Sequence, residues 1–240
     1  MSSPLLNLSN ISFHYPGGKP VLDGLDFHLH ASDRIGLVAP NGSGKTTLFH
    51  VIMGLLKADS GTVEAFGRPR QEESDFVEVR RRIGLLFQDA DDQLFSPTVL
   101  EDVAFGPLNL GKTREEALAV ARETLDFLRL KGFEDRVTYK LSGGEKRLVS
   151  LATVLAMQPE VLLLDEPSTG LDSNTKETLV EILNGLDLSL VLISHEFDFL
   201  SRTARHIYTL EDGRIRLDEE LQIHTHQHAH LMGKHPHRHI

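Results

Sequence analysis

The sequence predicts an α/β fold organised around a phosphate-binding loop. A glycine-punctuated segment occupies residues 39–47, and the apolar, partly β-branched residues 35–38 precede it. After the loop, apolar side chains recur at helical spacing, at Leu48, Val51, Ile52 and Leu55. The loop therefore joins a buried strand to the start of a helix. Two further apolar runs, at 83–87 and 161–164, have the length of buried strands and predict more of the same sheet.

The composition of the loop fits a polyphosphate ligand. A helix start directs backbone N–H groups and the positive end of the helix dipole at the loop, and glycine lets the main chain approach phosphate without a Cβ in the way. Lys45 can reach the β and γ oxygens, and the Thr46 hydroxyl is a ligand for Mg²⁺. We therefore predict nucleotide contacts from Ala39, Pro40, Asn41, Gly42, Ser43, Gly44, Lys45, Thr46 and Thr47.

Ala39 departs from the usual pattern, which opens with glycine. The other fixed positions are present, so the departure concerns only the geometry of the loop entry. The alternative interpretation of the segment is a glycine-rich turn between a strand and a helix, with a chance Lys-Thr pair.

Length and composition narrow the class of protein. The chain has 240 residues, enough for one large domain, and its 40% hydrophobic and 25% charged residues are ordinary for a soluble globular protein. It has no cysteine, which excludes disulfides and thiolate metal sites. No run approaches the ~18 consecutive apolar residues of a membrane span. No basic-then-apolar segment opens the chain, so we expect a cytoplasmic protein.

The formal net charge of -10 argues against two kinds of partner. Nucleic acid requires a basic face that releases its counterions, and anionic lipid attracts basic segments. We therefore predict no nucleic-acid partner and no direct lipid anchoring. Work at a membrane would require a protein partner that holds the chain there.

Two alternating runs ahead of the loop predict an antiparallel sheet. The first spans residues 6–15 and leads into the turn signal Tyr-Pro-Gly-Gly, and the second places Leu25, Phe27 and Leu29 on one face. Tyr15 offers a flat aromatic face on which an adenine ring can stack. The alternative is an ordinary tyrosine at the end of a strand.

Helical signals dominate residues from about 90 to 140, which we interpret as a helical subdomain inserted into the α/β core. Capping boxes begin at Thr98 and Thr113. Just before this region, Gln88 ends the strand at 83–87, where it is placed to reach Mg²⁺ or an attacking water; the alternative is a polar residue leaving a core. For the acidic residues 89–92 we favour a solvated loop over a cation site.

A second phosphate-type element follows at Ser142, Gly143 and Gly144. Ser142 and Glu145 form a capping box, which places both glycines in the first turn of a helix. Exposed N–H groups at a helix start again make an anion site. A plain helix cap is the alternative, although such a cap does not need two adjacent glycines.

Polar residues follow two of the predicted core strands. Asp165 is placed to hold Mg²⁺, and Glu166 is placed to orient or deprotonate the attacking water. The strand at 188–193 leads to His195, which at the same sheet edge would bond the γ-phosphate and help to position that water. The alternatives are an acidic loop start and a structural histidine.

Residues 221–240 form a His-rich tail. Seven histidines lie between His224 and His239, at every second residue within two clusters, and no apolar helical period accompanies them. We therefore expect disorder. Imidazole clusters bind Ni²⁺, Co²⁺, Cu²⁺ and Zn²⁺, so we predict that the tail buffers or delivers metal, with an inert, tag-like tail as the alternative.

In order and spacing, these motifs resemble the nucleotide-binding subunit of ABC transporters. The likeness spans about residues 5–217 and is carried by the loop at 39–46, Gln88, the Leu-Ser-Gly-Gly-Glu segment, Asp165 with Glu166, the turn at 168–172 and His195. The segments 88–99 and 102–109 are similar to the energy-coupling-factor importers, in particular the cobalt and nickel branch, although vitamin importers share them.

The resemblance implies a P-loop NTPase (RecA-like) core with an antiparallel β subdomain and an inserted α-helical subdomain, over residues 1–220. It implies a head-to-tail dimer that clamps ATP between the phosphate loop of one subunit and Ser142, Gly143 and Gly144 of the other, with Asp172 also at the nucleotide. Gln88 and the helical subdomain would relay closure to integral membrane transport subunits at the cytoplasmic face of the membrane.

On this basis we predict an ATPase that powers uptake of cobalt or nickel ions. Its catalytic residues are Glu166, His195, Gln88 and Lys45, and Mg²⁺ is held by Thr46, Gln88 and Asp165. One chain carries both halves of the site, so a homodimer would have two competent sites; a heterodimer with a paralogue is the alternative. The rival functions are a vitamin importer, a soluble ABC-type switch protein and a metal-storage protein.

Overall fold

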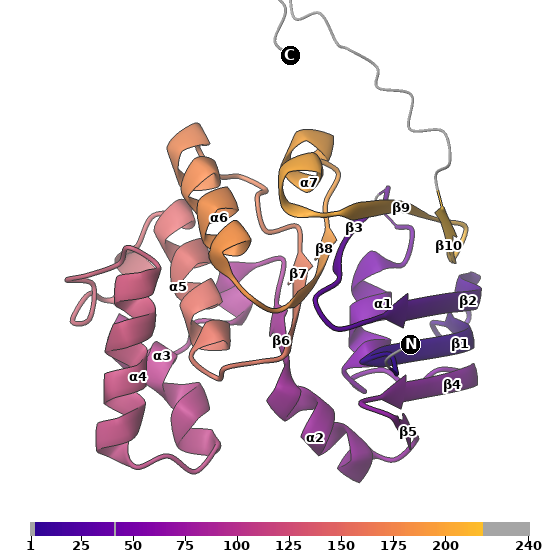
Figure 1. Cartoon of the computed structure of the whole chain (residues 1–240), viewed down its shortest axis with the longest axis horizontal. Coiled ribbons are helices and arrows are strands. Elements are labelled where there is room, and N and C mark those ends of the chain that lie inside the picture. The colour runs from indigo at the N-terminus through magenta and orange to yellow at the C-terminus, as the bar shows by residue number, and fades with distance from the viewer. Residues whose placement is uncertain (1–2, 41, 218–240) are drawn as a thin grey trace, which may run out of the picture.

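Two β-sheets with a helix between them carry the predicted phosphate loop (Figure 1). The structure is a computed structural model that describes residues 3–40 and 42–217. Helix α1 (Lys45–Ile52) contacts strands of both sheets and continues directly from the loop. Asn41 and the His-rich tail lie outside the described residues.

The larger sheet has six strands in the order β10-β9-β3-β8-β7-β6. All neighbouring pairs are parallel except β9 with β10, which form a hairpin. The strands are β3 (Arg34–Val38), β6 (Ile83–Leu86), β7 (Val161–Asp165), β8 (Ser189–Ile193), β9 (His206–Glu211) and β10 (Arg214–Leu217).

Alternation along the central strands divides the interior into two hydrophobic clusters. Leu163 and Val191 face the cluster that includes α1 and the smaller sheet, whereas Leu162 and Leu164 face the cluster formed by the later helices. Every side chain of β7 is buried. A parallel sheet covered on both faces requires such continuous apolar strands, which explains the runs seen in the sequence.

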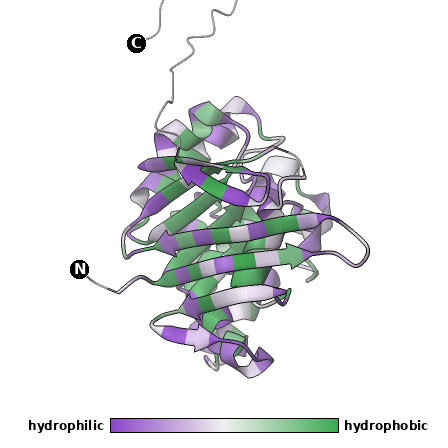
Figure 2. Cartoon of the chain, turned by 90° about the vertical axis from the view of Figure 1, so that its right-hand side faces the viewer, coloured by the Kyte–Doolittle hydropathy of each residue, from purple (hydrophilic) through white to green (hydrophobic). Residues whose placement is uncertain are grey.

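The smaller sheet is antiparallel, as predicted, with strand order β2-β1-β4-β5. Its strands are β1 (Leu6–His14), β2 (Pro20–Leu29), β4 (Ser60–Ala65) and β5 (Arg68–Arg70). Leu8 of β1 pairs with Phe27 on one side and Val63 on the other. Hydrophilic and hydrophobic residues alternate along these strands (Figure 2), because one face packs on the core and the other meets solvent.

The remaining helices pack around the larger sheet. They are α2 (Glu73–Arg82), α3 (Val99–Asn109), α4 (Arg114–Phe127), α5 (Gly143–Leu155), α6 (Ser173–Gly185) and α7 (Phe197–Thr203), with short 3-10 helices at Ala90–Asp92 and Thr138–Lys140. The three capping boxes predicted at Thr98, Thr113 and Ser142 are all present. Helices α3 and α4 pack with α5 on one side of the molecule, where Figure 1 shows them.

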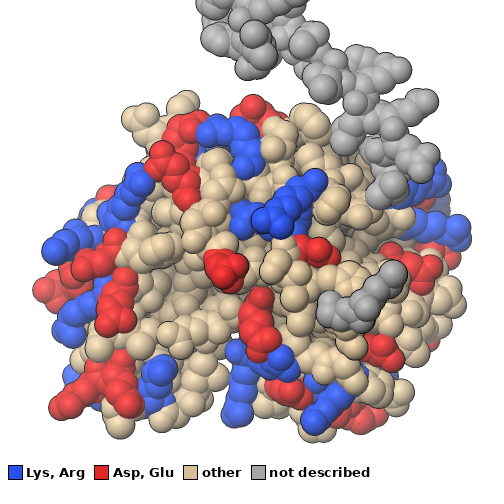
Figure 3. Space-filling view, viewed as in Figure 1, with Lys and Arg blue, Asp and Glu red and all other residues tan. Residues whose placement is uncertain are grey.

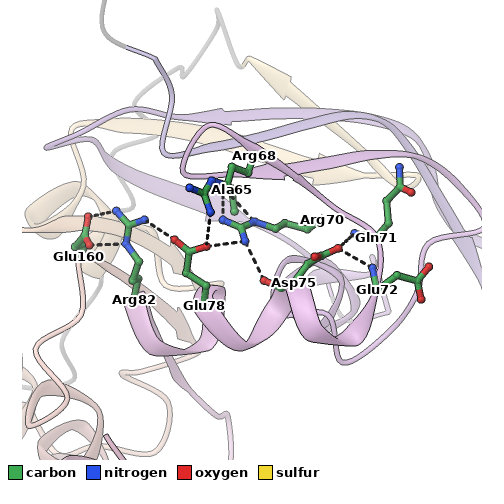
Figure 4. A network of polar contacts seen from close by, with 9 residues as sticks. All are labelled: Ala65, Arg68, Arg70, Gln71, Glu72, Asp75, Glu78, Arg82 and Glu160. Atoms are coloured by element: carbon green, nitrogen blue, oxygen red, sulfur yellow. Dashed lines mark hydrogen bonds and ion pairs between the residues drawn. The ribbon is translucent and has the colours of Figure 1, made fainter.

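A network of arginines and carboxylates ties the smaller sheet to the larger one through α2 (Figure 4). The buried guanidinium of Arg70 donates to the Asp75 carbonyl at 3.0 Å and to Glu78 at 2.8 Å. Arg82 makes two hydrogen bonds to Glu160, the residue before β7, at 2.6 and 2.8 Å. The network thus fixes the antiparallel sheet against the start of a core strand.

Within the described residues, no helix is both long and apolar enough to span a membrane.

Figure 3 shows acidic and basic side chains interleaved on the face drawn there.

Candidate functional site

The carboxyl ends of four parallel strands meet at one edge of the larger sheet. In the pairing register, Leu37 lies level with Ile193, Asp165 with Ile193, and Leu86 with Leu164. The segments that follow these strands carry the phosphate loop, Gln88, Glu166 and His195. Ligands bind at this kind of edge in open α/β sheets, so the fold gathers the predicted residues in one place.

The phosphate loop presents the uncapped start of α1. Gly44 occupies the N-cap position in a left-handed conformation, with φ of 94°, and no side chain caps the first turn. Gly42 also has a positive φ, 81°, and is exposed. Helix N–H groups without a side-chain cap need another acceptor, and phosphate oxygens supply one.

Ala39 is accommodated without backbone strain. Its side chain is 1% exposed and belongs to the hydrophobic cluster beneath the loop. Its φ is not among the positive values of the described residues, so the position does not require glycine. The methyl group therefore packs at the loop entry without distorting it.

We expect Ala39→Gly to change ATP affinity by less than about threefold and to lower stability by roughly 1 kcal/mol, because the substitution frees an unstrained backbone position and removes a buried methyl group. Equilibrium ATP titration and thermal unfolding measure the two effects. A large change in affinity would show that Ala39 does shape the loop.

Lys45, Glu166 and His195 form a continuous chain of contacts. The Lys45 ammonium donates to Oε1 of Glu166 at 2.6 Å, and both groups are buried. Nδ1 of His195 lies 2.9 Å from Oε2 of the same carboxylate. Thr169 adds a hydroxyl that donates to Oε2 at 3.2 Å. Glu166 itself has a positive φ, 49°, and its N–H donates to the Ile193 carbonyl at 2.9 Å.

The charges and hydrogen bonds around Glu166 keep its carboxyl ionised. Burial opposes its charge, but the hydrogen bond and positive charge of Lys45, together with His195, outweigh burial and lower the pKa of the carboxyl. The carboxylate is consequently a proton acceptor throughout the neutral range. Its contribution to stability is present above the ordinary carboxyl pKa and is lost as the pH falls through the lowered value.

Asp165 precedes Glu166 in the sequence, but the pKa of its carboxyl is shifted in the opposite direction. It is 2% exposed, and its Oδ2 accepts a hydrogen bond from the Thr46 hydroxyl at 2.6 Å. Its Oδ1 is buried without a hydrogen-bond partner. Burial raises the pKa of this carboxyl, although the Thr46 bond and Lys45 act against the shift. An orphaned anionic oxygen beside a threonine hydroxyl fits the hard, oxygen-preferring Mg²⁺ ion.

We expect Asp165→Asn to raise the melting temperature of the metal-free protein by about 2–4 °C, the shift that about 1 kcal/mol gives in a protein of this size. The asparagine side chain still accepts a hydrogen bond from the Thr46 hydroxyl. The substitution removes the buried negative charge of the carboxylate. Since the pKa of Asp165 is raised in the folded protein, its ionisation lowers stability as pH rises through that value.

The gain from Asp165→Asn should therefore be largest at neutral pH and shrink in acid. The same variant should lose Mg²⁺-dependent ATP turnover. Thermal unfolding across a pH series, in chelator, measures the first effect. A less stable variant at neutral pH would show that the carboxylate is satisfied by other groups.

Gln88 and Asp165 line the same cavity. The cavity has a volume of about 870 Å³ and is lined by Thr46, Asp165, Gln88 and Gly143, among others. The Gln88 side chain is exposed. Its carbonyl accepts a hydrogen bond from the buried guanidinium of Arg147 at 2.5 Å, so the backbone here is held by α5. The predicted contact of the Gln88 side chain with Mg²⁺ or water stays a prediction.

Two of the acidic residues 89–92 make hydrogen bonds within the protein. Asp89 accepts from the Asp91 N–H at 2.9 Å, and Asp91 pairs with Lys146 at 2.5 Å. Across residues 3–40 and 42–217, no group of three metal-binding side chains is close enough to hold an ion. The interpretation of this segment as a solvated, partner-facing loop stays a prediction.

Three other predicted residues lie at the surface. Tyr15 is 46% exposed, and its hydroxyl is 3.2 Å from the Thr47 hydroxyl, so its ring stands beside the phosphate loop. Ser142 is exposed at the start of α5, where its hydroxyl accepts from the Glu145 N–H. Asp172 caps α6, accepting from the Asn174 and Thr175 N–H groups at 3.0 and 3.1 Å. Nucleotide contacts from these residues stay predictions.

Two residues of the site were not predicted from the sequence. Thr169 reaches Glu166 because it lies in the same tight turn, three positions later. Arg147 holds the carbonyls of Phe87 and Gln88 from α5, across 60 and 59 positions of sequence. A basic residue on the buried face of an apolar helix was the only signal for Arg147.

Comparisons with known proteins identify the family of the chain. A family model described as ABC transporter matches residues 22–169. Over 238 residues the chain is 51% identical to a putative ABC transporter ATP-binding protein of Nitratidesulfovibrio vulgaris. The aligned region covers 99% of the chain and 87% of the relative. Over 215 residues it is 39% identical to the energy-coupling factor transporter ATP-binding protein EcfA of Methanothermobacter thermautotrophicus, covering 88% of the chain and 69% of that protein.

Solved structures give the same picture. The structure of cbiO1 from Clostridium perfringens, described as part of the ABC transporter complex cbiONQ, superposes with a TM-score of 0.79 at 31% identity and covers 90% of this chain and 88% of its own. A dimeric post-hydrolysis state of an ATP-binding cassette, bound to ADP and Pi, superposes with a TM-score of 0.80 at 26% identity, covering 88% and 96%. The chain belongs to the ABC transporter family and is an ATP-binding cassette ATPase of that family.

Proposed function

We propose that this ATPase powers an importer of the energy-coupling-factor type. The observation that carries the proposal is the contact chain from Lys45 through Glu166 to His195, beside the Thr46–Asp165 pair. These groups supply a phosphate-binding cation, a proton acceptor and a group that orients it. The likeness to proteins named EcfA supports the type of transporter.

In the proposed reaction, ATP binding moves Lys45 from Glu166 to the β- and γ-phosphates. The freed carboxylate then accepts a proton from the attacking water, whose oxygen forms a bond to the γ-phosphorus as the bond to the bridging oxygen of ADP breaks. His195, whose Nδ1 contacts Glu166, would reach the γ-phosphate through Nε2. The adenine stacks on Tyr15, beside Thr47.

Thr46, Asp165 and Gln88 would hold Mg²⁺. When bound, the ion neutralises charge on the β- and γ-phosphates. The buried Oδ1 of Asp165 is the atom that gains most, because it otherwise lacks a partner.

We propose that the working unit is a head-to-tail homodimer. Ser142 and Gly143 are exposed at the uncovered start of α5, where they would bind the γ-phosphate of ATP held by the other copy. The same polypeptide supplies both halves, so no complementary paralogue is needed. The solved cassette described as a dimer bound to ADP and Pi supports a dimeric working unit.

The proposed cargo is a divalent cobalt or nickel ion, and the His-rich tail would buffer or deliver it. The test is ATP-driven uptake by the intact complex, purified with its membrane subunits and reconstituted in vesicles. We expect uptake of Ni²⁺ or Co²⁺ that requires hydrolysable ATP and is weakened when the tail is deleted. Uptake of a vitamin alone would contradict the cargo, and a chain that copurifies with no membrane subunit from its own cells would contradict the transport role.

A further inference from the structure

The carbonyl oxygen of Val21, in β2, lies between two glycines that belong to distant parts of the chain. A Cβ built on Gly44, at the end of the phosphate loop, would stand 2.8 Å from this oxygen. A Cβ built on Gly213, in the turn between β9 and β10, would also stand 2.8 Å from it. Real Cβ atoms essentially never come this close. The hairpin turn and the phosphate loop therefore both pack on β2 at Val21, with no room for a methyl group at either glycine.

The hairpin turn is anchored on β2 by backbone and side-chain hydrogen bonds. The Asp23 N–H donates to the Gly213 carbonyl at 3.1 Å. Arg214 donates from Nε to the Asp23 carbonyl at 2.8 Å and from Nη2 to the Asp23 carboxylate at 3.0 Å. Asp212 and Gly213 have φ of 49° and 72°, the left-handed pair of a tight hairpin turn. The turn is thus held against β2 by the Gly213 carbonyl and the Arg214 side chain.

On the other side, β2 backs the point where the phosphate loop becomes a helix. Gly44 is the N-cap of α1 and precedes Lys45. Val21 Cγ1 and Leu22 Cδ2 would lie 2.9 and 3.1 Å from a Cβ on Gly44, so side chains of β2 complete the support. A shift of Val21 toward the loop displaces Gly44 and with it the N–H groups that face phosphate. Small displacements of such groups have large effects on binding and rate.

We propose that the β9–β10 turn is the outer support of the phosphate loop. Gly213, held on Asp23 by Arg214, sets the position of Val21 and, through Val21, that of Gly44 and the affinity for ATP. Gly213 and Arg214 are positioning residues in this account, since they act through β2. The inference rests on the proposed nucleotide site at the phosphate loop.

The experiment compares two glycines with nearly the same φ, 72° at Gly213 and 73° at Gly67. Gly67 follows Phe66 in the turn between β4 and β5, with φ of 73°, and a Cβ built on it meets nothing within 4 Å. Gly67→Ala therefore reproduces the backbone strain of Gly213→Ala without the contact on β2. On the full chain, we expect Gly213→Ala to raise the ATP dissociation constant about three- to tenfold and Gly67→Ala to change it less than about twofold.

A second pair covers the case in which Gly213→Ala does not fold. Arg214→Ala removes the anchor on Asp23, whereas Arg216→Ala, on the same strand, leaves it in place. We expect Arg214→Ala to weaken ATP binding about two- to threefold and Arg216→Ala to leave it unchanged. A merely structural role would lower the melting temperature in both glycine variants and leave both dissociation constants alone.

Lys45→Ala separates failure of this inference from failure of the site. If Lys45→Ala binds ATP as the unchanged chain does, the proposed nucleotide site is wrong. If Lys45→Ala loses ATP but a folded Gly213→Ala binds as tightly as Gly67→Ala, the site stands and the support role is overturned. Where Gly213→Ala does not fold, equal ATP affinity of Arg214→Ala and Arg216→Ala overturns it.

Discussion

Replacing Glu166 with glutamine should lower ATP turnover by about 10²-fold or more, the scale on which a general base contributes, while ATP binding persists. The amide keeps the size of the carboxyl and still offers an oxygen to Lys45 or His195, but it does not accept a proton from water. The substitution also removes the carboxylate to which Lys45 donates. Single-turnover phosphate release and equilibrium ATP binding, measured on the same preparation, separate the two effects.

Glu160→Gln is the matched control for this variant. Glu160 stands at the opposite end of β7 and pairs with Arg82. The control therefore removes a carboxylate from the same strand region without touching the sheet edge that carries the site. We expect near-normal turnover from it and a small loss of stability. Near-normal turnover in Glu166→Gln itself would exclude Glu166 as the base.

Gly143→Asp should abolish turnover without impairing folding or ATP binding at the phosphate loop. A Cβ on Gly143 meets nothing within 4 Å, and the residue has no positive φ, so the fold accommodates the side chain. An aspartate in the first turn of a helix is even favourable to the helix dipole. In the proposed dimer, however, this carboxylate would face the γ-phosphate held by the other copy and repel it.

Gly143→Ala is the control, since it adds a methyl group to the same open position without charge. We expect Gly143→Ala to retain most of the turnover. The ATP affinity of the isolated chain should be the same in Gly143→Ala and Gly143→Asp. Full activity of Gly143→Asp would mean that the start of α5 does not meet phosphate. Gly144 is less suited to this test, because a Cβ there would press on Thr175 at 3.1 Å.

Local patterns in the sequence predicted most of the fold. The buried strands β6, β7 and β8, the antiparallel sheet and three capping boxes all follow from spacing over a few residues. The meeting of Asp165, Glu166 and His195 at one edge follows too, because parallel strands end together. Strand order was not accessible: β8 lies between β3 and β7, although it follows both in sequence.

Contacts between residues far apart in the sequence were also not predictable from local sequence patterns. Lys45 and Glu166 are 121 positions apart, and no local rule predicts that their side chains form a hydrogen bond. The stacking of Gly213 on Val21 and of Val21 on Gly44 depends on how two sheets and a hairpin pack. Ala39 looked like a defect in the loop motif, whereas its packing and ordinary φ explain why alanine fits.

Mixing two inactive variants tests the shared site most directly. In a head-to-tail dimer of Lys45→Ala with Gly143→Asp, one site combines both defects, and the other combines an intact phosphate loop with an intact α5 start. If about half of randomly formed dimers are mixed, turnover should recover to roughly a quarter of that of the unchanged protein, because each mixed dimer has one working site. A mixture as inactive as its components, with mixed dimers shown to form, would contradict a site shared between two copies of the chain.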